Sequence, residues 1–166
     1  MKLETGIAGK TLIKESESLH DGDLTKIGLQ PKLCPAVIWT VGWGHALYFN
    51  GKPLQLDDLD MVDLYFPQFK NMTLEQADEL FNEDLKTFEN LVKRYLQVSV
   101  TQNQFDALVS FSFNCGYSQT LFSLINSKSS IDLIGQWWTT HYITGQGRQL
   151  PGLVIRRKKE FNLFKN

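Results

Sequence analysis

The chain has 166 residues, of which 42% are hydrophobic and 12% aromatic, and its 17 basic and 18 acidic residues nearly balance. This length is enough for one domain with a sizeable core, and the hydrophobic share excludes a disordered or low-complexity protein. The sequence has no apolar run long enough to cross a bilayer, and we recognise no secretory signal in residues 1–17. Two cysteines do not make a disulfide framework, which favours a reducing compartment during synthesis.

The charges are unevenly distributed along the chain. Residues 55–90 contain ten acidic residues and two lysines, a net charge of −8, whereas residues 145–166 contain six basic residues and one glutamate, a net charge of +5. The acidic segment is typical of a solvated helix face. The basic segment could contact an anionic polymer such as nucleic acid, lipid headgroups or bacterial wall material. Aromatic and basic residues are not interleaved there as in a nucleic-acid module, so we expect no nucleic-acid partner.

The first third of the chain predicts one helix followed by a small antiparallel sheet. Residues 5–19 form a modest helix that Gly6 and Gly9 weaken. β-Branched and aromatic residues predict a strand over 38–41. Asn50-Gly51 lies between two β-prone pieces and predicts a two-residue hairpin turn.

Beyond residue 70 the sequence has the 3.6-residue periodicity of amphipathic helices. Capping boxes at residues 73–76 and 101–104 begin helices that extend to about Tyr95 and Gly116. A helix capped by Ser130 and another after Pro151 follow. The prediction is one α+β domain over residues 1–166. It has a β-rich lobe at roughly 20–70 and a larger helical lobe at roughly 71–166 that includes the N-terminal helix. A crevice between such lobes is a natural ligand site. Four tryptophans are expected in the core: Trp39, Trp43, Trp137 and Trp138.

Several kinds of active site have no support in the sequence. G-x-S-x-G, H-E-x-x-H and C-x-x-C patterns are absent, and the three histidines are widely scattered, so we expect no metal and no cofactor. Glu17 lies at the C-terminal end of the first predicted helix. The helix dipole and partial burial disfavour an ionised carboxylate there, which suits a general acid for glycosidic cleavage. The alternative is an ordinary exposed helix glutamate.

Three separated motifs, in the expected order over most of the chain, make the sequence similar to one family. The first is Lys14-Glu15-Ser16-Glu17-Ser18-Leu19 followed by Cys34-Pro35-Ala36-Val37-Ile38-Trp39-Thr40-Val41-Gly42-Trp43-Gly44-His45. The second is Thr101-Gln102-Asn103-Gln104-Phe105-Asp106-Ala107-Leu108 with Phe113-Asn114-Cys115-Gly116, and the third is Pro151-Gly152-Leu153-Val154-Ile155-Arg156-Arg157. Together they resemble the phage-type lysozymes, the endolysin muramidases of glycoside hydrolase family 24.

The resemblance implies a lysozyme-like fold with the active-site cleft between its two lobes. It also implies hydrolysis of the β-1,4 bond between N-acetylmuramic acid and N-acetylglucosamine in peptidoglycan. Carried over by position, the catalytic residues are Glu17, Cys34 and Thr40. Residues for substrate binding or support are His45, Asn114 and Arg156. A holin is implied as the partner that opens the host membrane, so the protein would wait in the host cytoplasm before it reaches the wall. We expect a monomer.

Departures from the family pattern leave alternatives open. The usual Glu-Gly pair is Glu17-Ser18 here, and Glu15 lies about 200° away around the helix. Residues 21–31 lengthen the spacing to Cys34, are expected to enlarge the rim of the crevice, and supply Asp21 and Asp23 as possible second carboxylates. Cys34 itself could act as base, nucleophile or water-positioning group. Alternative functions are a non-catalytic wall-binding module, a lytic transglycosylase, or membrane disruption by the basic C-terminal segment.

Overall fold

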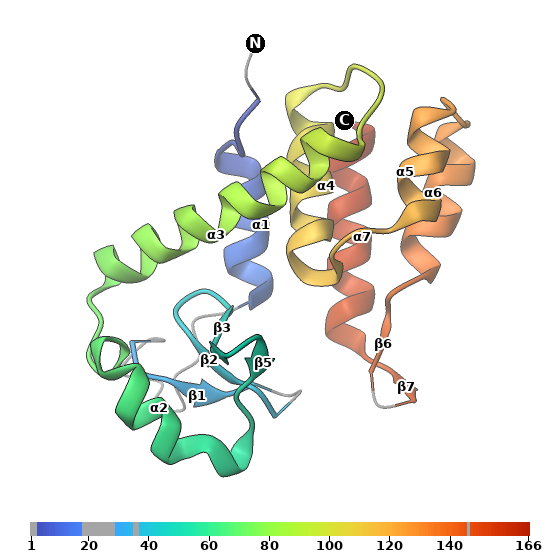
Figure 1. The fold of residues 1–166 in the computed structure, drawn as a ribbon. Helices are drawn as coiled ribbons and strands as arrows, with labels where there is room; N and C mark the ends of the chain where they lie inside the picture. The colour runs from blue at the N-terminus through green and yellow to red at the C-terminus, as the bar shows by residue number, and fades with distance from the viewer. Residues whose placement is uncertain (1–2, 18–28, 35–36, 146) are drawn as a thin grey trace. The chain divides into compact units, whose positions relative to one another are not determined.

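The computed structural model describes residues 3–17, 29–34, 37–145 and 147–166 (Figure 1). The chain forms two compact units, one of Met1–Ser16 with Leu85–Asn166 and one of Glu17–Asp84. The boundaries between the units fall within helices α1 (Ile7–Glu17) and α3 (Leu74–Tyr95). None of the helices in the described ranges is long and apolar enough to cross a membrane.

The unit of Glu17–Asp84, here called the β-rich unit, is built around a three-stranded antiparallel sheet. The sheet has the order β1 (Lys32–Leu33), β2 (Trp39–Val41), β3 (His45–Ala46). Strands β4 (Tyr48–Phe49) and β5 (Lys52–Pro53) form a separate hairpin. The strand predicted at 38–41 and the hairpin at Asn50-Gly51 are confirmed. Both turn residues have positive φ, 49° and 75°, as a type I′ turn requires.

Short helices follow the hairpin in the β-rich unit. They are η1 (Leu56–Asp58), α2 (Leu59–Tyr65) and η2 (Pro67–Phe69). Helix α2 is not predicted from the sequence, because seven residues are too few to display a helical period. The core of this unit gathers buried side chains from β2, α2, α3 and the connections next to the strands and α3: Val41, Leu47, Leu54, Val62, Met72 and Ala77. Trp39 and Trp43 pack against this core but remain only partly buried.

The unit of Met1–Ser16 with Leu85–Asn166, here called the helical unit, contains four further helices. They are α4 (Gln102–Cys115), α5 (Gln119–Asn126), α6 (Ile131–Thr140) and α7 (Pro151–Lys165). Strands β6 (Thr144–Gly145) and β7 (Arg148–Gln149) form a small hairpin before α7. Residues 105–112 of α4 are buried without interruption, so α4 is the central helix of this unit. Trp138 is fully buried, as predicted.

Side-chain caps begin the predicted helices. Thr73 and Gln76 exchange two hydrogen bonds at the start of α3, and Thr101 and Gln104 do the same at α4. Ser130 accepts a hydrogen bond from the amide of Leu133 at α6. Both capping boxes and the Ser130 cap are therefore confirmed. Helix α5, capped by Ser118, was not predicted.

Two carboxylates hold the N-terminal end of α1 within the helical unit. Glu89 Oε1 accepts hydrogen bonds from the amide (2.6 Å) and hydroxyl (2.7 Å) of Thr5. Asp106 accepts from the amides of Gly6 (2.9 Å) and Gly9 (3.0 Å). A Cβ at Gly9 would lie only 2.8 Å from the Asp106 Cβ. The glycine that weakens the helix intrinsically is therefore needed for this close approach.

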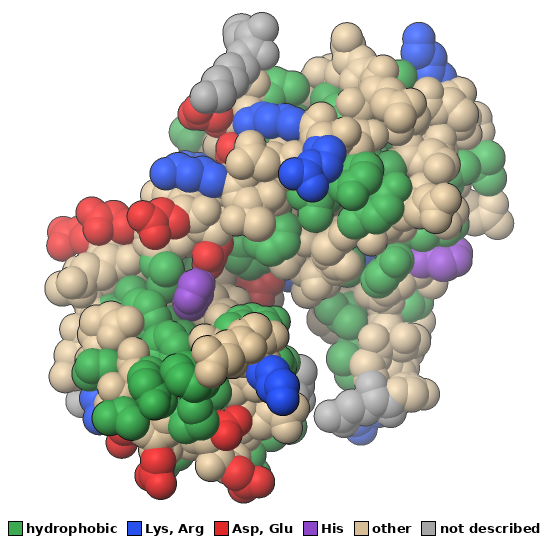
Figure 2. All heavy atoms as spheres, in the orientation of Figure 1, with side chains coloured by type: hydrophobic (Ala, Val, Ile, Leu, Met, Phe, Trp, Pro, Cys, Tyr) green, Lys and Arg blue, Asp and Glu red, His purple; other side chains and the backbone are tan. Residues whose placement is uncertain are grey.

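The acidic segment is mostly the solvated face that its composition predicted. Figure 2 shows acidic side chains gathered on the surface. Glu75, Glu79 and Glu83 are exposed on the first half of α3. Glu89 is the exception, because it is 7% exposed and binds Thr5. The prediction of a solvated face is wrong for Glu89, since the buried amide and hydroxyl of Thr5 donate to its carboxylate.

Candidate active site

Glu17 is the last residue of α1 and is partly buried. Its carboxylate lies against the backbone of Gly44 in the turn between β2 and β3. A Cβ built on Gly44 would be 3.0 Å from Glu17 Oε2 and 3.2 Å from its Cδ. Gly44 has φ +93°, a conformation that L side chains rarely adopt. Gly44 is therefore required for two reasons: the turn has a positive φ there, and a side chain at this position would press on Glu17.

Two polar contacts attach this turn to helix α3. On one side of Gly44, Trp43 Nε1 donates a hydrogen bond to Asp78 Oδ1 at 2.6 Å. On the other side, His45 Nδ1 lies 3.0 Å from both carboxylate oxygens of Asp84. The backbone that faces Glu17 is thus fixed on both sides to one rigid helix. The histidine expected to support the site forms one of these two attachments, and the sequence analysis did not anticipate either aspartate.

Cys34 and Thr40 face the same side of the sheet. Lys32 pairs with Thr40, and the amide of Cys34 donates to the carbonyl of Ile38, which extends the β1–β2 ladder by one pair. Paired residues share a face and so do alternate residues along a strand, which places Cys34 diagonally across from Thr40. Both side chains are partly buried. The Thr40 hydroxyl donates to the Ile38 carbonyl at 3.1 Å, so its oxygen lone pairs can accept a hydrogen bond.

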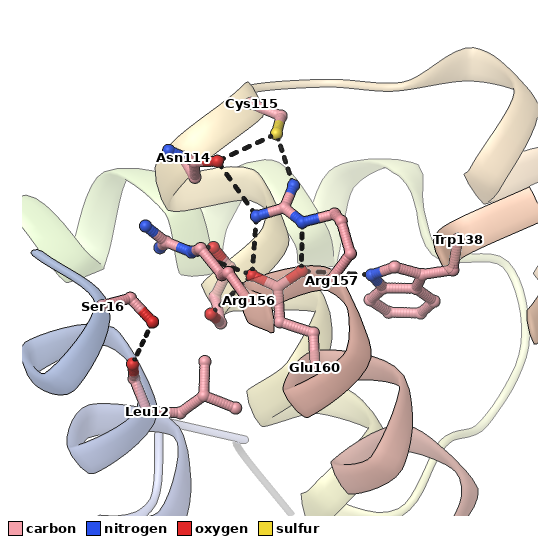
Figure 3. Close-up of polar contacts among 9 residues, drawn as sticks. Leu12, Ser16, Asn114, Cys115, Trp138, Arg156, Arg157 and Glu160 are labelled. Carbon is pink, nitrogen blue, oxygen red and sulfur yellow. Dashed lines mark hydrogen bonds and ion pairs between the residues drawn. The ribbon is translucent and has the colours of Figure 1, made fainter. Parts of the chain in front are cut away.

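Arg156 belongs to a buried polar network in the helical unit, and Asn114, which is exposed, contacts the edge of that network (Figure 3). Its centre is Glu160, which is fully buried and accepts hydrogen bonds from four groups in α4, α6 and α7: Ser110 Oγ, Trp138 Nε1, Arg156 Nε and Arg157 Nη2. Arg156 also donates to the carbonyl of Ser110. Asn114 Oδ1 accepts from Arg157 Nη2 at 2.9 Å. These two predicted support residues therefore bind other protein groups.

The two arginines correct one expectation about the basic C-terminal segment. Arg156 is 4% exposed and Arg157 is 0% exposed, so these two arginines are not part of a basic surface that could contact an anionic polymer. Their spacing from Glu160, four and three residues along a helix, is the sequence signal of this pairing. Arg157 Nη1 also donates to Cys115 Sγ at 2.6 Å. Burial nevertheless raises the pKa of the Cys115 thiol, an effect that the positive charge of Arg157 opposes.

Three predictions fall on residues outside the described ranges. They are Asp21 and Asp23 as possible second carboxylates, and the enlarged rim predicted for residues 21–31, most of which lie outside the described ranges. The described part of that segment is Leu29 to Pro31, of which the Leu29 carbonyl accepts a hydrogen bond from the amide of Met72.

We expect Gly44→Ala to reduce catalytic activity by one to two orders of magnitude, because a displacement of about 1 Å in a catalytic group can have that effect. The new methyl group would press on the Glu17 carboxylate. Gly51→Ala is the matched control, since Gly51 also has positive φ (+75°) but a Cβ added there would meet nothing within 4 Å. Both variants place an alanine at a positive φ, so both carry a backbone penalty. Equal activity in the two variants would contradict the contact with Glu17.

Comparison with known proteins identifies the family. Residues 25–160 match the family model described as phage lysozyme. The chain is 30% identical over 164 residues to an endolysin of Acyrthosiphon pisum secondary endosymbiont phage 1, and the match covers 95% of each chain. It is 32% identical to an endolysin of Bacillus phage PZA, of which it spans 53%. The muramidase domain of SpmX from Asticaccaulis excentricus has a similar structure, with a TM-score of 0.69, 28% identity and 99% coverage of both chains. The chain belongs to the phage lysozyme family.

Proposed function

We propose that this chain hydrolyses the β-1,4 bond between N-acetylmuramic acid and N-acetylglucosamine, and that both compact units form one catalytic domain. As a member of the phage lysozyme family, the chain is a peptidoglycan hydrolase of the endolysin type. The observation that carries the assignment of residues is the Glu17 carboxylate held against the Gly44 turn. That turn joins the strand of Thr40 to the strand of His45.

Glu17 is the proposed general acid. Cleavage of a glycosidic bond requires a proton on the leaving oxygen, because the sugar alkoxide is a poor leaving group. The carboxyl group belongs to the last residue of α1, is partly buried and lies against the Gly44 backbone. In its protonated form Glu17 can donate to the glycosidic oxygen.

Thr40 and Cys34 are proposed to orient the attacking water, and Cys34 could also accept a proton from it. The Thr40 hydroxyl proton is directed to the Ile38 carbonyl, so Thr40 Oγ1 can accept a hydrogen bond from the water, and a water lone pair stays free to attack the anomeric carbon. Cys34, on the same face, is placed to orient the water or to accept its other proton as thiolate.

The role of Cys34 gives a prediction about two substitutions. We expect Cys34→Asp to retain wall lysis, since a carboxylate can orient water or accept its proton. Cys34→Ala removes both capacities and should lower the initial rate on purified peptidoglycan by about 100-fold, the scale of a lost general base. Turbidity loss measures both rates. If Cys34→Ala lyses the wall as fast as the wild type, Cys34 only fills space.

The reaction itself is tested by mass spectrometry of purified peptidoglycan after digestion. A muramidase releases fragments with a reducing N-acetylmuramic acid end, with one water added for each bond cleaved. An anhydro-muramic end would identify a lytic transglycosylase instead. Sedimentation of the protein with peptidoglycan, without any new ends, would identify a wall-binding module.

We further propose that the protein acts as a monomer that accumulates in the host cytoplasm and reaches the wall after a holin opens the membrane. The support is that its relatives are phage endolysins. Expression in the cytoplasm with and without a holin tests this order of events: lysis should require the holin. Lysis at the same time in both cultures would overturn the proposal.

A further inference from the structure

The turn beside Glu17 has little stiffness of its own. It contains Gly42, Trp43 and Gly44, and both glycines have positive φ, 58° and 93°. Glycine loses more backbone freedom on folding than any other residue, so a turn of this composition must be held by contacts from outside it. Because Gly44 lies against the Glu17 carboxylate, the contacts that hold this turn also fix the surroundings of the proposed general acid.

The side chain of Trp43 connects the turn to α3. Trp43 Nε1 donates a hydrogen bond to Asp78 Oδ1 at 2.6 Å. The centroid of the Trp43 ring lies 6.5 Å from that of Phe81, three residues further along the same helix. Gly42 lies beside the residue that precedes Asp78, because a Cβ built on Gly42 would be 3.7 Å from the Cβ of Ala77. Neighbouring residues of α3 therefore hold the turn.

Asp78 is suited to hold the indole because its own position is well fixed. It lies in the second turn of α3, just after the capping box formed by Thr73 and Gln76. Its side chain is partly buried. Hydrogen bonds to an ionised carboxylate are shorter and stronger than those between neutral groups, and an indole can only donate. Asp78, the Gly44 turn and Glu17 all belong to the β-rich unit.

We propose that Asp78 is a positioning residue for the reaction, acting on Glu17 through Trp43 and Gly44. This inference rests on the proposed function, in which Glu17 is the general acid. Asp78 touches neither the substrate nor the reacting atoms in this proposal. It keeps the Gly44 backbone where the Glu17 carboxyl group needs it. Since a displacement of about 1 Å in a catalytic group lowers the rate strongly, a side chain that acts through two contacts can control the rate.

Two substitutions separate the hydrogen bond from the volume of the side chain. Asp78→Leu leaves a side chain of similar shape that accepts no hydrogen bond, whereas Asp78→Asn retains an oxygen that can accept from Trp43 Nε1. We expect Asp78→Leu to lower kcat on soluble peptidoglycan fragments by about tenfold and to leave KM within about twofold. The loss is limited because the contact between His45 and Asp84 remains. Asp78→Asn should keep kcat within about threefold of the wild type.

Glu79→Leu is the matched control, since Glu79 is the next residue in α3, is exposed and carries the same charge. It should keep kcat within about twofold of the wild type, as is usual for a surface substitution. The NMR signal of the Trp43 indole N–H, assigned by its loss in Trp43→Phe, reports the hydrogen bond directly. That signal should shift in Asp78→Leu and stay in place in Glu79→Leu. Thermal unfolding checks that each variant is folded.

The combination of Asp78→Leu with Glu17→Gln tests whether Asp78 acts through Glu17. Once the acid is removed, Asp78→Leu should have little further effect, so the double variant should stay within about twofold of Glu17→Gln. A general structural defect would lower the activity by the same factor in both backgrounds. Trp43→Phe removes the donor from the other end of the same hydrogen bond and gives the same comparison.

Three results would overturn the proposal: a wild-type kcat in Asp78→Leu, a change in KM alone, or an equal loss with and without Glu17. Each of them is distinguishable from failure of the proposed function. That failure would appear as full activity in Glu17→Gln, or as absence of new reducing ends from the wild-type protein.

Discussion

Glu17→Gln should lower the rate of peptidoglycan cleavage by about 10²–10⁴-fold, the usual contribution of a general acid. The amide has nearly the same shape as the carboxyl group, so the contact with Gly44 can persist while the acidic proton is lost. The fold should therefore be retained. Reducing ends released per minute measure the activity, and far-UV circular dichroism with thermal unfolding checks the structure.

Glu15→Gln is the matched control for this variant. Glu15 is in the same helix, two residues earlier, and its side chain is 55% exposed and paired with Lys159 at 2.9 Å. A screened surface ion pair of this kind contributes little to the stability of the protein. Glu15→Gln should consequently keep activity within about twofold of the wild type. The assignment would be wrong if Glu15→Gln abolished cleavage, or if Glu17→Gln retained full activity.

Glu160→Ala should reduce the free energy of unfolding by about 3–5 kcal/mol, the range observed when one partner of a buried ion pair is removed. The substitution leaves the guanidinium groups of Arg156 and Arg157 inside the helical unit without their carboxylate. It also removes the acceptors of Ser110 Oγ and Trp138 Nε1. Urea unfolding followed by circular dichroism measures the loss, provided the slope of the transition is unchanged.

A variant of the exposed ion pair between Lys159 and Glu15 is the control for Glu160→Ala. Lys159 is the residue before Glu160 in α7, and its side chain is 50% exposed. Lys159→Ala should change stability by less than about 1 kcal/mol, because solvent and salt screen the pair. A similar loss in both variants would mean that the buried network does not stabilise the helical unit more than a surface contact.

The long helices were predictable because their signals are local. Thr73 and Gln76, and likewise Thr101 and Gln104, carry both halves of a capping box within four residues. Asn50-Gly51 contains the whole type I′ turn in two residues. Helix α2 and strands β6 and β7 were not predicted, because segments of two to seven residues are fixed by packing and pairing with distant residues.

For the candidate site, the sequence alone determined the residue types, their order and their spacing. It identified Glu17 at the end of a helix and Thr40 in a strand. Only the tertiary structure decided what touches them: the Gly44 backbone beside Glu17, and Asp78 and Asp84 holding the adjacent turn. It also decided that Arg156 and Arg157 are buried. Local propensity and capping depend on neighbours in the chain, whereas burial and charge pairing depend on residues that folding brings together from far apart.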